Sequence, residues 1–179
     1  MNDSVPPPRK AGLPLRIMHW LMVLAIVSAW TFIYAKGLFD QGAPERAFLT
    51  SAHIFAGLGV LLLLLPRVAA RLLSPLPAVT PSPPRWQSRL ARLVHALLYV
   101  GMLLTPVLGI LFVQTAGKDI SFLGLTLPDF IGTHKSVSHG IREVHETLGL
   151  AMLYLVIAHA GAALYHHLFQ RDDALKRML

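Results

Sequence analysis

Hydrophobic and polar positions divide the chain into four long apolar runs separated by shorter polar segments. The runs cover approximately residues 15–35, 47–65, 90–113 and 144–169. Each is close to the roughly 20 residues that a helix needs to cross the hydrocarbon core of a bilayer. They are continuous, whereas the strands of a membrane barrel alternate in polarity over about 10 residues. The pattern therefore predicts an all-α protein, a four-helix transmembrane bundle.

The segments between these runs are rich in proline, glycine and charge. Residues 1–14 predict a flexible tail, and residues 74–84, which contain five prolines, predict an extended linker. Residues 114–140 predict a longer loop with room for a short helix or cap. A cleaved signal peptide is disfavoured, because the first apolar run is long for one and lacks a small-residue cleavage motif. We therefore expect a single membrane domain over residues 15–179.

Composition agrees with a membrane environment. The chain is 54% hydrophobic and 14% charged, with a mean hydropathy of +0.56, whereas soluble domains carry about a quarter charged residues. It contains no cysteine, which excludes disulfides, thiolate zinc sites and cysteine-ligated iron–sulfur clusters. The formal net charge is +7, but the basic residues flank apolar runs instead of forming a polar domain. A lipid bilayer is the expected surrounding, and nucleic acid is not an expected partner.

Lysine and arginine are distributed unequally between the two sides of the predicted bundle. The richer side carries eleven of them, namely Arg9, Lys10, Arg16, Arg67, Arg71, Arg85, Arg89, Arg92, Arg171, Lys176 and Arg177. The other side carries five, namely Lys36, Arg46, Lys118, Lys135 and Arg142. The positive-inside rule then predicts that both termini and the 66–89 connection lie in the cytoplasm. Topology and anionic lipid headgroups account for the basic excess.

Five of the nine histidines fall inside the apolar runs, where polar side chains are costly and mark functional sites by default. With helices of alternating direction, His53 and His145 lie toward the outer side. His19, His95 and His159 lie toward the inner side. His145 and His159 are fourteen residues apart, which places them on one helix face with a rise of about 21 Å. The intramembrane histidines are therefore expected to form two layers.

Pairs of imidazoles from different helices, in an apolar interior without thiolates or carboxylates, are typical ligands of bis-histidine haem iron. A structural zinc site is less consistent with this set, because four protein ligands are not available in either layer. A proton relay or transporter that uses the titration of histidine remains an alternative. An isolated intramembrane histidine would more often be a hydrogen-bonding residue between helices.

Small and basic residues near the histidines allow two interpretations. Small residues follow three of the histidines, namely Gly57, Gly59, Gly149 and residues 160–163. They would let a porphyrin lie against a helix, or they serve ordinary helix packing in lipid. Arg67 and Arg71, near the inner end of the second run, are candidates to pair with haem propionates, or they are positive-inside anchors.

Four segments together resemble the bacterial cytochrome b561 family. They are PLRIMHW at 14–20, AHIFAGLGVLLLLLPRVAAR at 52–71, HETLG at 145–149 and HAGAALYHHLFQRDDALKRML at 159–179. The resemblance extends from about residue 13 to residue 179. It implies a bacterial inner-membrane protein with two b-type haems in a four-helix bundle, similar to the cytochrome b subunits of hydrogenases and formate dehydrogenases.

The resemblance also implies ligand assignments. It pairs His53 with His145 on the iron of an outer haem, and His19 with His159 on the iron of an inner haem. His95 is then left unpaired in the inner layer, as a possible contact of a haem propionate or of a quinone. The resemblance assigns no role to His134 and His139, whereas His166 or His167 could relay protons to a quinone.

A quinone site near the inner haem is implied as well. His166 matches the family position near bound quinone, and Arg85 is a second candidate. Val144 departs from the family, which often has tryptophan immediately before the HETL motif. This departure concerns the outer substrate funnel and leaves the ligand assignment unchanged.

The implied activity is the transfer of electrons from superoxide on the outer side to ubiquinone near the cytoplasmic side. Arg142 and Lys135, with Lys36, are candidates to steer the superoxide anion. The acidic residues of the same side would weaken that field; they are Asp119, Asp129, Glu143 and Glu146. Two alternatives remain: a cytochrome b subunit that relays electrons between quinone and a partner dehydrogenase, and a non-redox transporter that uses its histidines.

Overall fold

A computed structural model describes residues 10–74 and 76–179, and four long helices dominate this part of the chain. Their bounds are α1 Leu13–Ala35, α2 Pro44–Leu73, α3 Arg85–Thr115 and α4 Lys135–Tyr165. All four are long and apolar enough to cross a membrane. The mostly helical, membrane-spanning architecture predicted from the apolar runs is confirmed. Residues 1–9 lie outside the described residues. They make up most of the predicted tail over 1–14 and include Arg9 of the basic count.

Three of the four helices extend well beyond the apolar runs that predicted them. α2 continues past Pro66 to Leu73, α3 begins at Arg85, five residues before its apolar run, and α4 begins at Lys135. α1 begins at Leu13, only two residues before its run and inside the expected tail. Hydropathy marks the part of a helix that lies in hydrocarbon, whereas the backbone hydrogen bonds of a helix continue into the headgroup region. A proline inside a membrane helix is tolerated where neighbouring groups satisfy the freed carbonyl.

The connection between α3 and α4 differs from the expected loop. It contains a hairpin of β1 Ser121–Phe122 and β2 Leu125–Thr126, with Ser121 opposite Thr126. The two residues of its turn, Leu123 and Gly124, both have positive φ, at 52° and 79°. Glycine suits that conformation, and leucine does not, so sequence patterns for tight hairpins do not identify this turn. The predicted all-α class therefore needs a small correction.

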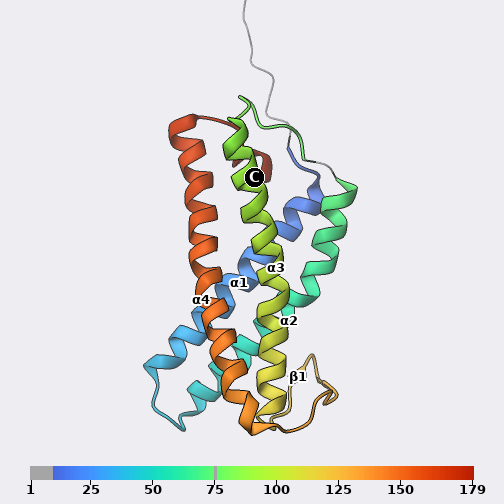
Figure 1. Cartoon of the computed structure of the whole chain (residues 1–179), viewed down its shortest axis with the longest axis vertical. Helices are drawn as coiled ribbons and strands as arrows, with labels where there is room; N and C mark the ends of the chain where they lie inside the picture. Colours follow the sequence, from blue (N-terminus) through green and yellow to red (C-terminus); the bar gives the residue numbers. More distant parts are fainter. Residues whose placement is uncertain (1–9, 75) are drawn as a thin grey trace, which may run out of the picture.

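The helices run up and down in chain order (Figure 1). One end of the bundle, called here the terminal end, carries Ala11, the linker over 76–84 and residues 171–179. The opposite end, called the hairpin end, carries the α1–α2 connection over 36–43 and the hairpin loop over 116–134. The predicted extended linker is thus observed, and the two sides of the basic-residue count correspond to these two ends.

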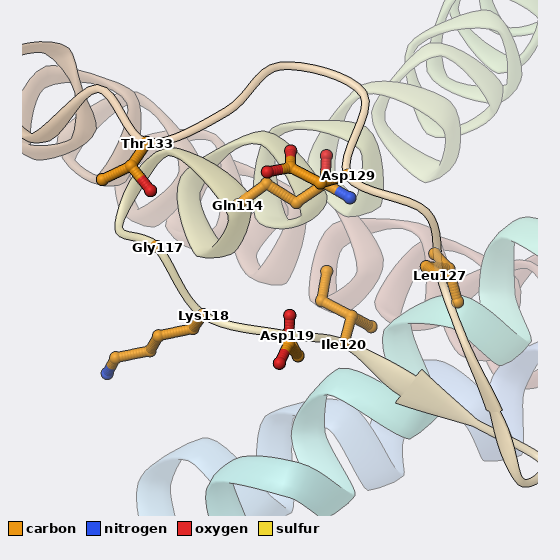
Figure 2. Close-up of a pocket in the computed structure, with 8 residues that line it drawn as sticks. All are labelled: Gln114, Gly117, Lys118, Asp119, Ile120, Leu127, Asp129 and Thr133. Atoms are coloured by element: carbon orange, nitrogen blue, oxygen red, sulfur yellow. The ribbon is translucent and has the colours of Figure 1, made fainter.

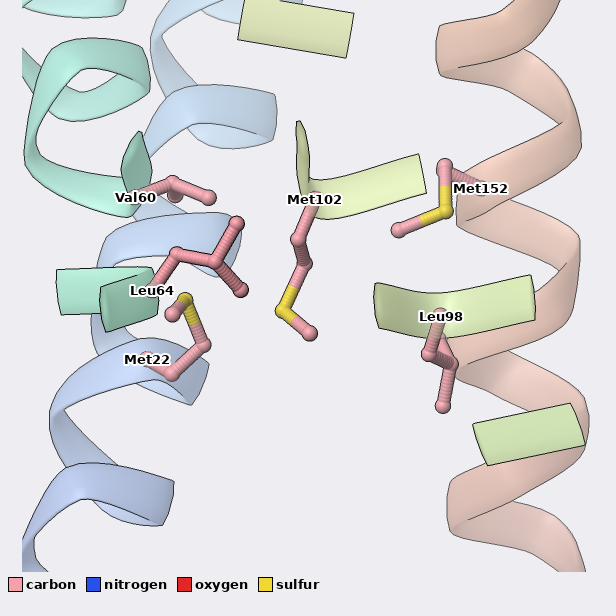
Figure 3. Packing of buried hydrophobic residues seen from close by; sticks show 6 residues of the cluster. All are labelled: Met22, Val60, Leu64, Leu98, Met102 and Met152. Carbon is pink, nitrogen blue, oxygen red and sulfur yellow. The ribbon is translucent and has the colours of Figure 1, made fainter. Parts of the chain in front are cut away.

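The main core is formed by side chains from all four long helices (Figure 3). Its buried members are Met22, Val60, Leu64, Leu98, Met102 and Met152. Methionine is flexible and fills irregular gaps between helices. Gly101 is also buried, and a Cβ atom there would overlap the side chain of Met152, so glycine permits the close approach of α3 and α4. Outside this core, large apolar side chains such as Leu62 and Leu65 point outward, as expected of a surface that faces lipid.

The chain beyond α4 folds back across the terminal end. It contains a π-helical turn η2 His166–Gln170 and a 3-10 turn η3 Lys176–Met178. The indole Nε1 of Trp20 donates a hydrogen bond to the carbonyl of Met178 at 2.9 Å, and the amide of Ala11 donates to the carbonyl of Arg177 at 2.9 Å. The C-terminal residues therefore close the terminal end over the start of α1.

Candidate functional site

Two histidines meet near the hairpin end. His53 of α2 and His145 of α4 have ring centres 6.2 Å apart. Nδ1 of His53 lies 2.8 Å from the carbonyl of Ala29, and Nδ1 of His145 lies 2.9 Å from the carbonyl of Thr105. A carbonyl accepts and cannot donate, so each Nδ1 carries the ring proton. Each neutral ring therefore has an unprotonated Nε2, the form in which a histidine binds metal with a second-shell hydrogen bond behind it.

The spacing of this hairpin-end pair suits a single metal ion between the rings. Metal–imidazole bonds of about 2 Å, plus about 1 Å from each nitrogen to its ring centre, would put the centres of two rings that bind one metal ion about 6 Å apart. The observed 6.2 Å between His53 and His145 matches that value. The two residues are 92 positions apart in sequence and come from different helices, so the bundle itself brings them together.

Three histidines form a second layer nearer the terminal end. The ring centres of His19 and His159 are 6.5 Å apart, and those of His95 and His159 are 5.3 Å apart. The first distance would again suit two ligands of one metal ion, and the second is shorter than the spacing estimated above. Among the described residues, no group of three or more histidine, aspartate or glutamate side chains is placed to hold one metal ion. The spacing of His19 and His159 would therefore suit the inner-haem pair that the family resemblance implies.

Arg67 of α2 adds a partly buried positive charge to this terminal-end layer. Its Nη2 donates a hydrogen bond to Nδ1 of His19 at 3.1 Å, and its guanidinium carbon lies 5.7 Å from the ring centre of Tyr99. Its Nε and Nη1 are buried and have no hydrogen-bond partner within the described residues. A buried cation with unpaired donors is costly unless an anion approaches it. Arg67 therefore fits an anionic group such as a haem propionate, while Arg71 is exposed.

His19 is held differently from the hairpin-end histidines. Because Arg67 can only donate, Nδ1 of His19 accepts, and its ring proton lies on Nε2. A His19 that bound iron through Nε2 would carry its proton on Nδ1 and release Arg67. The guanidinium would then have one further donor for a carboxylate, so ligation at His19 and anion binding at Arg67 favour each other.

The residues expected near a quinone do not form one cluster. His166 begins η2 and is half-buried, and its Nδ1 lies 2.6 Å from Oδ2 of Asp172. Arg85 is the exposed first residue of α3. The partner of His166 was not identified from the sequence, where Asp172 belongs to a charged segment typical of a solvated terminus.

One of the three charges expected to attract an anion at the hairpin end, Arg142, is paired with a carboxylate. Arg142 forms an ion pair with Glu146, with Nε 2.7 Å from Oε1. Lys135 is the exposed first residue of α4. Asp129 accepts hydrogen bonds from the amides of Gly132 and Ile131, and these bonds hold the pKa of its carboxyl below the usual range. That carboxylate stays ionised at neutral pH and opposes the positive field.

A cavity of about 200 Å³ lies beside the hairpin (Figure 2). It is lined by Gln114, Gly117, Lys118, Asp119, Ile120, Leu127, Asp129 and Thr133. One lysine and two carboxylates give the lining a net negative charge. The buried Gln114 donates to the carbonyl of Pro128 at 2.8 Å and accepts from the amide of Phe130 at 3.4 Å, so it fixes the loop. This cavity is therefore a structural feature of the hairpin loop and is not built to collect anions.

The model of a family described as prokaryotic cytochrome b561 matches residues 10–179. The chain belongs to the prokaryotic cytochrome b561 family. The resemblance drawn from the sequence motifs is thus confirmed. Membership makes the chain a b-type haem protein of the membrane, and this class of protein transfers electrons. Family membership also argues against the non-redox transporter, an alternative that the histidines alone left open.

Three curated relatives are similar over nearly the full chain. Cytochrome b561 homolog 1 of Escherichia coli (strain K12) is 33% identical over 162 residues, covering 90% of this chain and 92% of the relative. Cytochrome b561 homolog 2 of the same strain is 29% identical over 180 residues, covering 96% of this chain and 92% of the relative. The probable superoxide oxidase CybB of Yersinia pestis is 27% identical over 164 residues, covering 90% of this chain and 91% of the relative.

A glycine of α3 is a further site residue that the sequence analysis did not identify. A Cβ atom at Gly109 would lie 3.2 Å from Cε1 and 3.5 Å from Nδ1 of His145. Gly57 and Gly59, for which the sequence left contact with a haem and ordinary helix packing as alternatives, have no heavy atom of another residue within 4 Å of such a Cβ in the described part of the chain. Gly109 thus gives the His145 ring its space, while the positions of Gly57 and Gly59 are open.

Gly109→Val is expected to lower the amount of haem bound by this cytochrome b561. The valine side chain would press on the His145 ring and disturb its hydrogen bond to Thr105. Gly140→Val is the matched control, because it makes the same change in α4 where the described structure leaves the position open. Haem per protein, measured by pyridine haemochrome, should fall for Gly109→Val and not for Gly140→Val. Equal haem content in both variants would contradict the packing role of Gly109.

Proposed function

We propose that this protein binds two b-type haems and transfers electrons from superoxide at the hairpin end to ubiquinone at the terminal end. The observation that carries the proposal is the pair of histidine couples at two depths, each with a ring spacing of 6.2 or 6.5 Å that suits one iron. Similarity over nearly the full chain to a relative named as a probable superoxide oxidase supports the donor.

The histidine pairs and Arg67 would hold the cofactors. His53 and His145 are the proposed ligands at the hairpin end, and His19 and His159 those at the terminal end. When bound, two haems would supply one-electron transfer between the two ends of the bundle. Along α4, Met152 of the main core lies between His145 and His159, so apolar side chains separate the two layers.

The proposed reaction balances with two superoxide anions for each quinone. Each superoxide loses one electron and becomes dioxygen, and ubiquinone gains two electrons and two protons to become ubiquinol. Because the donor is an anion and the acceptor is apolar, the two substrates are expected at different places. Superoxide reaches the exposed hairpin end from water, whereas ubiquinone reaches the terminal-end layer from the bilayer. The protons are taken up at the terminal end.

The proposed orientation in the bacterial inner membrane puts the terminal end in the cytoplasm. The segments that carry the larger basic group, apart from Arg9, lie at that end (Figure 1). Basic residues are retained on the cytoplasmic side of a membrane protein during insertion. Superoxide would then be consumed on the outer side of the membrane.

Single cysteines are expected to report this orientation, because the chain has none of its own. Ser82 lies in the linker of the terminal end and Ser121 in the hairpin, and both are exposed. A membrane-impermeant maleimide added to intact cells should label Ser121→Cys and not Ser82→Cys, and both should react after permeabilisation. Labelling of Ser82→Cys in intact cells would reverse the proposed orientation.

Stopped-flow mixing of the purified, oxidised protein with superoxide tests the proposed donor. Haem reduction should follow mixing directly, and added short-chain ubiquinone should reoxidise the haem and accumulate as ubiquinol. Superoxide dismutase is the control that should abolish the reduction. Haem that does not respond to superoxide would exclude this donor.

A second candidate function is that of a cytochrome b subunit that relays electrons between quinone and a partner dehydrogenase. The observations that favour it are at the hairpin end, where Arg142 is paired with Glu146 and the cavity lining is net negative. Val144 also replaces the tryptophan that the family often has next to the HETL motif. Rapid haem reduction by a quinol, with no response to superoxide, would establish this function instead.

A further inference from the structure

A buried histidine–aspartate pair lies at the terminal end. Nδ1 of His166 is 2.6 Å from Oδ2 of Asp172. The Asp172 side chain is 2% exposed and that of His166 is 22% exposed. A buried carboxylate is costly unless it is paired and hydrogen-bonded, so the position of Asp172 is strongly determined by its partners.

The backbone around the pair is unusual in two respects. α4 changes to the π-helical turn η2 at His166, and Arg171 takes the left-handed conformation with φ of 55°. π-helical turns and left-handed non-glycine residues are enriched at functional sites. The amide of Asp172 donates to the carbonyl of His166 at 3.2 Å, and its Oδ1 accepts from the amide of Ala174 at 2.9 Å. The chain reversal therefore holds the carboxylate against the ring.

This arrangement suits a histidine that holds and releases a proton at Nε2. The carboxylate accepts the Nδ1 proton, so neutral His166 presents an unprotonated Nε2. A second proton on Nε2 would leave the Nδ1 hydrogen bond to Asp172 intact. The same logic applies to general acids in which a carboxylate orients a histidine.

We propose that Asp172 and His166 form a proton relay for quinone reduction, an inference that rests on the function proposed above. The Nε2–H bond of His166 breaks as an O–H bond forms on the quinone, and the electrons come from superoxide. Water at the terminal end returns the proton to Nε2, and a second cycle completes the quinol. Asp172 does not touch the quinone and is a positioning residue.

Other charged and titratable groups lie around the pair. Arg177 of the C-terminal segment interacts electrostatically with Asp172, Asp173 and Arg71 of α2, and His167 follows His166 in η2. Asp173 accepts a hydrogen bond from the amide of Thr80 at 2.9 Å and lies 3.9 Å from Nε of Arg177. It has the same charge as Asp172 in the same segment but no contact with His166. Asp173→Asn is therefore a matched control for Asp172→Asn.

The test measures reoxidation of the haem by a short-chain ubiquinone after reduction with dithionite, so that it does not depend on superoxide. Wild-type protein and Asp173→Asn should react rapidly, with a rate that varies with pH. Asp172→Asn should bind the same amount of haem, react at least about tenfold more slowly, and lose that pH dependence. A purely structural role of Asp172 predicts an unchanged pH profile, and that result would overturn the relay.

His166→Gln tests the relay without removing the carboxylate that accepts from Ala174. It should slow reoxidation to the same extent as Asp172→Asn. The double variant should be no slower, since both substitutions disable the same proton relay. Additive slowing would show that the two residues act separately. If wild-type haem is not reoxidised by quinone, the relay and the proposed acceptor both fail. If quinone reoxidises it but superoxide does not reduce it, the donor fails and the relay stands.

Discussion

His145→Ala is expected to remove one of two haems and leave the other in place. His53 would then offer a single axial ligand, and the terminal-end pair, about 21 Å away along α4, would keep both of its ligands. Haem per protein by pyridine haemochrome should fall from about two to about one. His53→Ala should have the same effect, and the combination of both should lose no further haem.

A matched control for this experiment lies on the same helix. His139 is exposed in α4 and its Nδ1 lies 3.6 Å from Glu143. His139→Ala should therefore keep the wild-type haem content. Wild-type protein that carries about one haem when fully loaded would contradict the two-site arrangement. So would a His145→Ala variant that loses all of its haem without unfolding.

Loss of the terminal-end haem is expected to abolish quinone reduction without preventing the reaction with superoxide. His159→Ala removes the histidine that both neighbours in its layer face. The hairpin-end haem should still be reduced by superoxide in stopped flow, but added ubiquinone should reoxidise it at no more than about a hundredth of the wild-type rate. The His159→Ala variant is therefore expected to accept electrons from superoxide and to be unable to pass them to ubiquinone.

His19→Ala and His95→Ala separate the two possible partners of His159. The ring spacing of 6.5 Å favours His19 as the ligand, and the 5.3 Å spacing places His95 beside the pair. His19→Ala should therefore behave as His159→Ala does, whereas His95→Ala should retain both haems. The opposite result would exchange the roles of His19 and His95 and would leave Arg67 bound to a structural histidine.

The class of fold was predictable because hydrocarbon imposes a simple requirement on sequence. Each crossing segment must be continuous, apolar and close to 20 residues long, and the four runs meet that requirement. The ends of the helices were less predictable. α4 begins nine residues before the run that revealed it, because a helix outside hydrocarbon needs hydrogen bonds and no particular hydropathy.

The layers of histidine were also predictable, because depth in a helix follows directly from position in the sequence. His53 and His145 were expected at one depth and are observed as neighbours. Which ring faces which within the terminal-end layer was not determined by depth. His19, His95 and His159 share a level, and their ring spacings depend on how α1, α3 and α4 are rotated and spaced.

Position along the chain therefore determined the number of membrane helices, their direction and the depth of each histidine, since these follow from a fixed rise per residue and from the thickness of a bilayer. Tertiary structure alone decided the contacts across helices and chain reversals. Gly109 lies against His145 across two helices, Arg67 meets His19 at the terminal end, and Asp172 reaches His166 only because the chain turns back at Arg171. Such contacts depend on the rotation of each helix about its axis and on single backbone conformations, and neither has a periodic signature in sequence.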